Sequence, residues 1–146
     1  MYKHVLISTD GSEVAKKGVD QGLALAKALG AKATVITVTE SFPVYASAAG
    51  GWIPTEMGNY DEIQKEYADR VLAAAKTQAE GLGVVATTLH VPNSQPAEAI
   101  IENAKSQGCD VIVMASHGRR GLGRLILGSQ TSEVLSRSSV PVLVVR

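Results

Sequence analysis

Short apolar runs alternate along the chain with longer amphipathic stretches. The apolar runs are rich in Val, Ile and Thr, which favour strands, and span residues 5–7, 33–38, 84–91, 110–115 and 141–145. Apolar residues at helical spacing occupy the intervals 12–29, 60–82, 96–107 and 129–137. A strand–helix alternation of this kind predicts an α/β fold: an open, five-stranded, mostly parallel sheet with helices on both faces.

Boundary signals sharpen several of these elements. Ser12 is placed to cap the first helix and Gly30 to end it. The apolar face of this helix carries unusually small side chains, so we expect the helix to lie close to the sheet. The residues of this face are Ala15, Gly18, Val19, Gly22, Ala26 and Leu29. The second helix is predicted from about Tyr60, with Ile63, Tyr67 and Val71 in register. The preceding segment, about 40–58, is predicted to be a long loop that is either functional or mobile.

The carboxyl ends of the predicted strands are where a ligand is expected. In open α/β sheets, ligands bind beyond these ends at the point where the strand order reverses. The periodicity leaves the strand order open, but it places four segments at such ends: 8–10, 38–39, 91–92 and 115–118.

Composition narrows the classes of function. Lys and Arg together number 14, as do Asp and Glu, so no long-range field draws the chain to nucleic acid or to an anionic membrane. No apolar run approaches the roughly 20 residues that span a bilayer, and the N-terminus has no apolar signal core. The single cysteine, Cys109, excludes a disulfide within the chain. We therefore expect one cytoplasmic domain of 146 residues, with no nucleic-acid or membrane partner.

The densest chemical signal is the glycine-rich segment 115–129, ASHGRRGLGRLILGS. Its glycines allow backbone N–H groups to approach a ligand, and Ser129 opens a helix whose N-terminus suits phosphate. Arg119 and two further arginines add positive charge; the alternative is a flexible turn with solvated arginines. The pattern is neither GxxxxGK[ST] nor a GxGxxG after the first strand, which argues against a kinase, a motor ATPase or an NAD-dependent dehydrogenase.

This segment resembles the signature of the universal stress protein family, Gly-x2-Gly-x9-Gly-Ser/Thr. Gly118 matches the second glycine, and after nine intervening residues Gly128-Ser129 match the end of the signature. The resemblance extends to HVLISTDGS at the N-terminus, to PAEAI at 96–100, to DVIVMASHG at 110–118 and to the final PVLVV, so it covers essentially the whole chain.

The resemblance implies a fold like that of the adenine nucleotide alpha hydrolases, with strand order 3-2-1-4-5. Asp10 would then lie beside residues 115–118 at the reversal of strand order. It also implies an ATP ligand, often with a divalent metal such as Mg²⁺. A homodimer is implied through the last strand, from Val140 to Arg146, which this order makes an edge strand with unpaired backbone groups.

The resemblance also assigns roles to individual positions. Asp10 would hold the ribose, its neighbours Ser8 and Thr9 would approach the phosphates, and the backbone of Val38 would meet the adenine. The remaining implied site residues line the cleft or contact phosphate, the last two through their backbone: Met114, Ala115, His117, Gly118, Arg119, Gly128, Ser129, Gln130 and Thr131.

Ala115 departs from the family pattern, because it stands where the signature has its first glycine. If that glycine serves only to leave space, the extra methyl group lowers affinity modestly; if it requires a positive φ, alanine adds strain of about 1 kcal/mol.

Other interpretations stay open at this stage. Asp10 could cap the first helix or its turn, His117 could be a general base, and His4 and His90 are expected to be structural or exposed. Cys109 is expected to be a small packing residue. The leading hypothesis is a dimeric ATP-binding module that acts in the stress response through nucleotide-dependent conformation. The alternatives are a slow ATP hydrolase and a nucleotide-free dimeric scaffold.

Overall fold

The computed structural model describes residues 1–41, 54–118 and 127–146. Much of the predicted loop 40–58, and Arg119 with most of the glycine segment, lie outside these ranges. The described elements are, in chain order, β1 (His4–Ser8), α1 (Glu13–Leu29), β2 (Lys32–Val38), α3 (Pro54–Leu82), β3 (Ala86–Val91), α4 (Pro96–Ser106), β4 (Val111–Ala115), α5 (Ser129–Arg137) and β5 (Val142–Val145).

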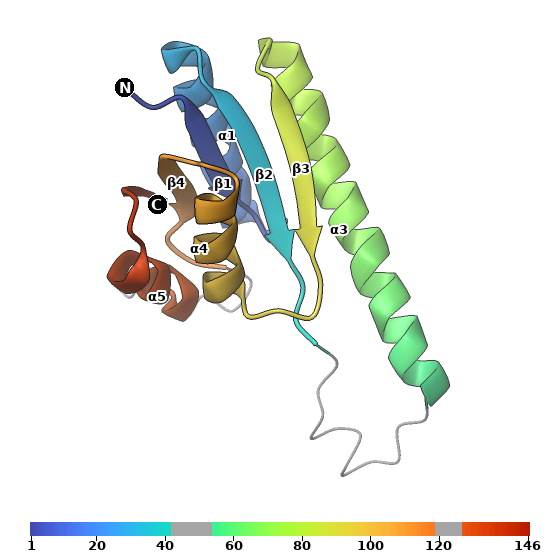
Figure 1. Ribbon diagram of the computed structural model, residues 1–146. Coiled ribbons are helices and arrows are strands. Elements are labelled where there is room, and N and C mark those ends of the chain that lie inside the picture. Colours follow the sequence, from blue (N-terminus) through green and yellow to red (C-terminus); the bar gives the residue numbers. More distant parts are fainter. Residues whose placement is uncertain (42–53, 119–126) are drawn as a thin grey trace.

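The strands form one parallel sheet in the order β3-β2-β1-β4-β5 (Figure 1). This confirms the predicted fold class and the order implied by the family resemblance. The order reverses between β1 and β4, so the carboxyl ends of these two strands mark the expected position of a ligand. β5 pairs only with β4 in the described sheet and is therefore an edge strand.

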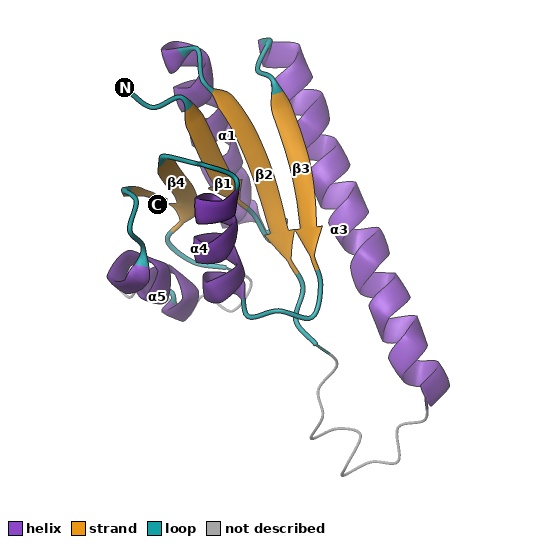
Figure 2. Ribbon diagram, viewed as in Figure 1, coloured by secondary structure: helices purple, strands orange, loops and turns teal. Residues whose placement is uncertain are grey.

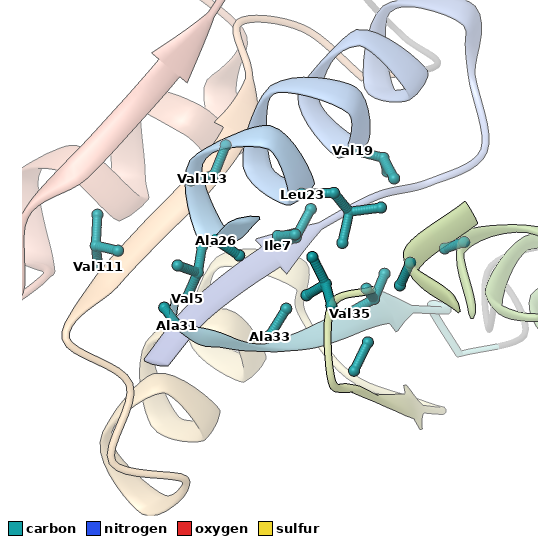
Figure 3. Close-up of a cluster of buried hydrophobic side chains, with 14 of the residues drawn as sticks. Val5, Ile7, Val19, Leu23, Ala26, Ala31, Ala33, Val35, Val111 and Val113 are labelled. Carbon is teal, nitrogen blue, oxygen red and sulfur yellow. The ribbon is translucent and has the colours of Figure 1, made fainter. Parts of the chain in front are cut away.

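Helices cover both faces of the sheet (Figure 2), and an apolar cluster holds them on each face. On one face α1 and α3 pack against alternate strand residues, including Val5, Ile7 and Val113 (Figure 3). On the other face α4 and α5 pack against the intervening residues, such as Leu6 and Ile112. Successive side chains of a strand point to opposite faces, so both sets must be apolar where both faces are covered.

The small face of α1 allows the close approach that the sequence predicts. A Cβ atom on Gly22 would lie 2.6 Å from Cγ1 of Ile7, and one on Gly18 would lie 3.3 Å from the backbone nitrogen of Ala115. At the helix start, the Ser12 hydroxyl accepts a hydrogen bond from the Ala15 N–H, and at its end Gly30 adopts a left-handed conformation with φ 62°. Both predicted boundary signals are confirmed.

The start of α3 and its buried face differ from the prediction. The helix begins at Pro54, so the predicted loop 40–58 is too long at its end. Ile63, predicted to be in register with the apolar face, is 64% exposed. The buried stripe consists of Ala68, Leu72, Ala75 and Ala79. Alanine occurs all around this helix, and only packing against the sheet selects which alanines are buried.

The third strand starts two residues later than predicted, at Ala86. Gly83 has φ 73° and ends α3, and the Val84 N–H donates back to the Ala79 carbonyl at 2.9 Å. These contacts form a helix C-terminal motif beyond Leu82, so Val84 takes part in ending α3 and not in the strand. Val85 is 74% exposed.

Within the described ranges, no helix is both long and apolar enough to cross a membrane.

Candidate functional site

A cleft of about 680 Å³ opens at the carboxyl ends of β1, β2 and β4. It lies where the strand order reverses, as expected for an open α/β sheet. Every predicted site residue that the structure describes lines this cleft: Ser8, Thr9, Asp10, Val38, Met114, Ala115, His117, Gly118, Gly128, Ser129, Gln130 and Thr131. The remaining one, Arg119, lies outside the described residues.

Asp10 stands directly beside the glycine segment. A Cβ atom on Gly118 would lie 2.7 Å from Oδ2 of Asp10, so glycine is required there for this carboxylate position. The other carboxylate oxygen accepts a hydrogen bond from the Ser12 N–H at 3.0 Å. The cap of α1 is Ser12, so Asp10 does not cap the helix. The bond from the Ser12 N–H shows instead that the Asp10 side chain caps the turn before the helix, which confirms the second half of the capping interpretation.

The turn after β1 is held by neighbouring threonines. The Thr9 hydroxyl accepts a hydrogen bond from the Gly11 N–H at 3.1 Å, and the Thr37 hydroxyl donates to the Thr9 carbonyl. Thr9 and Thr37 are both buried. The Asp10 side chain is thus presented by a turn that its neighbours fix on two sides.

The first turn of α5 faces the same cleft. The Gly128 N–H donates to the Ser116 carbonyl at 2.8 Å, and the Thr131 hydroxyl donates to the Ala115 carbonyl at 2.9 Å. These bonds attach the start of α5 to the end of β4. The first N–H groups of a helix have no partner within it and carry partial positive charge, so the backbone of Ser129 and the residues after it is suited to an anion.

Ala115 sits in β4 with an ordinary strand conformation. Among the described residues other than glycine, a positive φ occurs at Asn93 alone. The strain alternative for Ala115 is therefore excluded. Strand alternation places Ala115 on the face of Val111 and Val113, which α1 covers, and its backbone lies against Gly18 of that helix.

Part of the cleft wall is apolar. Val38 and Met114 line it from the ends of β2 and β4, and Pro96 and Ile100 line it from the first turns of α4. A flat, largely apolar group fits between such side chains, while charged groups fit the α5 end.

Sequence reasoning missed the α3 wall of the cleft. Tyr60, Gln64 and Tyr67 recur at helical spacing, so they share one face of α3, and all three line the cleft. The spacing was visible in the sequence, but it does not tell which face of a helix meets a cleft. The other lining residues outside the prediction are Ala15, Thr37, Thr39, Glu40, Pro96, Ile100 and Leu127.

The histidines occupy different settings. Nδ1 of His117 lies 2.9 Å from the Ser116 hydroxyl at the cleft wall. His4 is buried, with Nε2 2.7 Å from the Thr34 hydroxyl, and His90 Nε2 is 2.8 Å from the Thr39 hydroxyl. His4 and His90 are thus both hydrogen-bonded within the fold, as the structural interpretation expects.

Cys109 packs in the cluster beneath α4, and burial raises the pKa of its thiol to about 11. The packing interpretation is confirmed. Among the residues that the structure describes, no group of three or more His, Cys, Asp or Glu side chains could hold a metal ion.

The strand order and the cleft at its reversal define the class of α/β proteins that bind ligands at a topological switch point. Within that class, the chain belongs to the universal stress protein family, whose model matches residues 1–146. It is 34% identical to the universal stress protein YxiE of Bacillus subtilis, with all of both chains covered.

Solved structures of the family have the same fold. The structure of MJ0577 from Methanocaldococcus jannaschii is 28% identical in sequence and superimposes with a TM-score of 0.85. The match covers 99% of this chain and 96% of that one. A universal stress protein in complex with cAMP is 22% identical with a TM-score of 0.73, over 99% of this chain and 97% of that one. An Arabidopsis thaliana family protein with AMP bound is 15% identical with a TM-score of 0.68, over 98% and 90%.

Proposed function

We propose that this protein is a single-domain, cytoplasmic ATP-binding module that acts as a homodimer in the stress response. The observation that carries the proposal is the juxtaposition of Asp10 with Gly118 at the switch point, facing the first turn of α5. Bound nucleotide would alter the surface around the cleft, which other molecules of the cell would read.

Charge decides which end of the nucleotide lies where. A carboxylate accepts hydrogen bonds and repels phosphate, so Asp10 fits the hydroxyl groups of the ribose. The N–H groups of Ser129, Gln130 and Thr131 fit the phosphates. Val38 and Met114 would then lie against the adenine.

Known family structures support the choice of an adenine nucleotide. Proteins of this fold have been solved with cAMP and with AMP. The size of the cleft, about 680 Å³, falls within the range of small-molecule and cofactor sites. We propose the triphosphate, with Mg²⁺ bound through it, because Gly118, Gly128 and Ser129 all line the cleft around the start of α5, where backbone N–H groups would meet more than one phosphate.

Homodimerisation is proposed through β5. Its outer edge lacks a strand partner in the described sheet, and Leu143 on it is 43% exposed. Pairing with the same strand of a second copy would satisfy the edge and cover this leucine.

Two measurements on purified protein test nucleotide binding. Denaturation followed by absorbance at 260 nm reveals nucleotide that co-purifies, and isothermal titration with ATP and Mg²⁺ on nucleotide-stripped protein gives the affinity. We expect saturable heat with one ATP per chain. Absence of both co-purified nucleotide and titration heat would contradict the proposal and favour the nucleotide-free scaffold.

A further inference from the structure

Tyr67 of α3 reaches the turn that presents Asp10. Its hydroxyl donates a hydrogen bond to the Asp10 backbone carbonyl at 2.7 Å, across 57 positions of sequence. The bond is partly buried, and Tyr67 itself lines the cleft. It therefore ties the turn after β1 to a helix that the family signature does not include.

The next residue in the turn, Gly11, leaves the space that the Tyr67 hydroxyl occupies. Gly11 has φ 80°, and a Cβ atom on it would lie only 2.4 Å from Oη of Tyr67 and 2.6 Å from Cγ2 of Val71. Both the positive φ and the lack of space for a Cβ atom therefore favour glycine at this position. Gly11 and Tyr67 thus form a matched pair in which the missing side chain of one admits the ring of the other.

The ring of Tyr67 is itself supported. The guanidinium carbon of Arg70 lies 5.9 Å from the ring centroid, within the range of a cation–π contact. One turn towards the N-terminus, Gln64 lines the cleft on the same helix face. The hydroxyl is consequently aimed from a long helix and not from a loop.

We propose that Tyr67 is a positioning residue for ribose recognition, which acts through Asp10. The bond to the Asp10 carbonyl fixes the peptide from which the Asp10 side chain departs, so that Oδ2 faces the cleft beside Gly118. Loss of the hydroxyl frees this peptide, and the carboxylate meets the ribose hydroxyl groups less often in the right geometry. The inference rests on the proposed function, because it takes ATP as the ligand and Asp10 as its ribose contact.

The test compares ATP with 2′,3′-dideoxy-ATP, which lacks the ribose hydroxyl groups, by isothermal titration in the presence of Mg²⁺. Wild type should prefer ATP by roughly tenfold or more, because the hydroxyl groups bond to a charged acceptor. Asp10→Ala should remove most of this preference. Tyr67→Phe should lower the affinity for ATP roughly threefold to tenfold while leaving that for the dideoxy analogue nearly unchanged.

Tyr2→Phe is the matched control, since it removes the hydroxyl of a tyrosine that packs against the core and does not line the cleft, and it should keep the full preference. Thermal unfolding of each variant checks that the fold is retained. Gly11→Ala disturbs the same hydrogen bond, because its methyl group would displace the Tyr67 hydroxyl. This variant should also lose the preference for ATP over the dideoxy analogue.

The outcomes separate the inference from the proposed function. If wild type binds neither nucleotide, the proposed function fails and the inference with it. If wild type prefers ATP and Tyr67→Phe keeps that preference in full, nucleotide binding stands and the inference is overturned. Equal weakening of both ligands by Tyr67→Phe would also overturn it, because that result indicates general loosening of the cleft.

Discussion

At the scale of single residues, the site depends on the space that Gly118 leaves for the Asp10 carboxylate. A methyl group there would come within 2.7 Å of an Asp10 carboxylate oxygen. The carboxylate is the end of a side chain, so Gly118→Ala should displace it at little cost to folding. We expect the free energy of unfolding to change by less than about 1 kcal/mol, while ATP affinity falls roughly tenfold.

Gly81→Ala is the control for this substitution. It lies in α3, where a Cβ atom would have nothing within 4 Å. It should leave ATP affinity unchanged and stabilise the helix by about 0.5–1 kcal/mol. Titration and urea unfolding of both variants check this; unchanged ATP affinity in Gly118→Ala would contradict the placement of Asp10.

His4 makes stability depend on pH. Burial, and next the charge of Lys32, lower its pKa below the ordinary 6.5 of histidine. The unfolded chain therefore takes up a proton near pH 6.5 that the folded chain refuses. Stability from this residue is complete above that pH and declines as the pH falls below it, by at most about 1.4 kcal/mol per pH unit.

His4→Gln removes this proton linkage while leaving a group that can bond the Thr34 hydroxyl. Urea unfolding at about pH 7.5 and about pH 5.5 should show a smaller loss of stability on acidification in the variant than in wild type. His90, whose pKa burial also lowers, contributes equally to both proteins. Identical losses in the two proteins would show that His4 is not the source.

At the scale of elements, α5 supports the start of α4. The Gln130 side-chain oxygen accepts a hydrogen bond from the Ala97 N–H at 2.9 Å, while Gln95, at the N-cap of α4, makes no such side-chain bond. Gln130→Ala should lower the free energy of unfolding by about 1 kcal/mol, as for loss of a helix cap.

Gln130→Glu separates this capping from nucleotide binding. A carboxylate can still accept from the Ala97 N–H and suits a helix N-terminus, so stability should be retained. Its negative charge beside the first turn of α5 should nevertheless weaken ATP binding severalfold. Chemical denaturation and titration together test this pair, and full ATP affinity in Gln130→Glu would argue against phosphate at α5.

The elements also show how far sequence reasoning reaches. Strand identities, the caps of α1 and the residues at strand ends follow from local signals, because Ser12, Gly30 and the apolar runs act within a few residues. The start of α3 at Pro54 and the burial of Ala68 in preference to Ile63 depend on how a helix lies across a sheet. That information is tertiary, and so is the contact of Tyr67 with Asp10.

For the whole molecule, the proposed homodimer depends on the edge strand β5. Val142 packs against the core beneath α4 and α5, so a charge there would damage the fold as well as an interface. Leu143→Lys is the sharper test, because this residue is 43% exposed. Light scattering should give a dimer for wild type and a monomer for Leu143→Lys.

Leu29→Lys is the matched control, since Leu29 is 42% exposed at the end of α1. It should remain dimeric. A dimer that survives Leu143→Lys, or a wild type that is monomeric, would contradict assembly through β5.

The central claim is that an adenine nucleotide occupies the cleft between Asp10 and α5. Amide chemical-shift mapping during an ATP titration tests it most directly, because each N–H reports its own surroundings. The amides of Val38, Gly118 and Ser129 should shift saturably, while that of Gly108, outside the cleft, should not. Saturable shifts that avoid these cleft amides, or no shifts at millimolar ATP, would contradict the account.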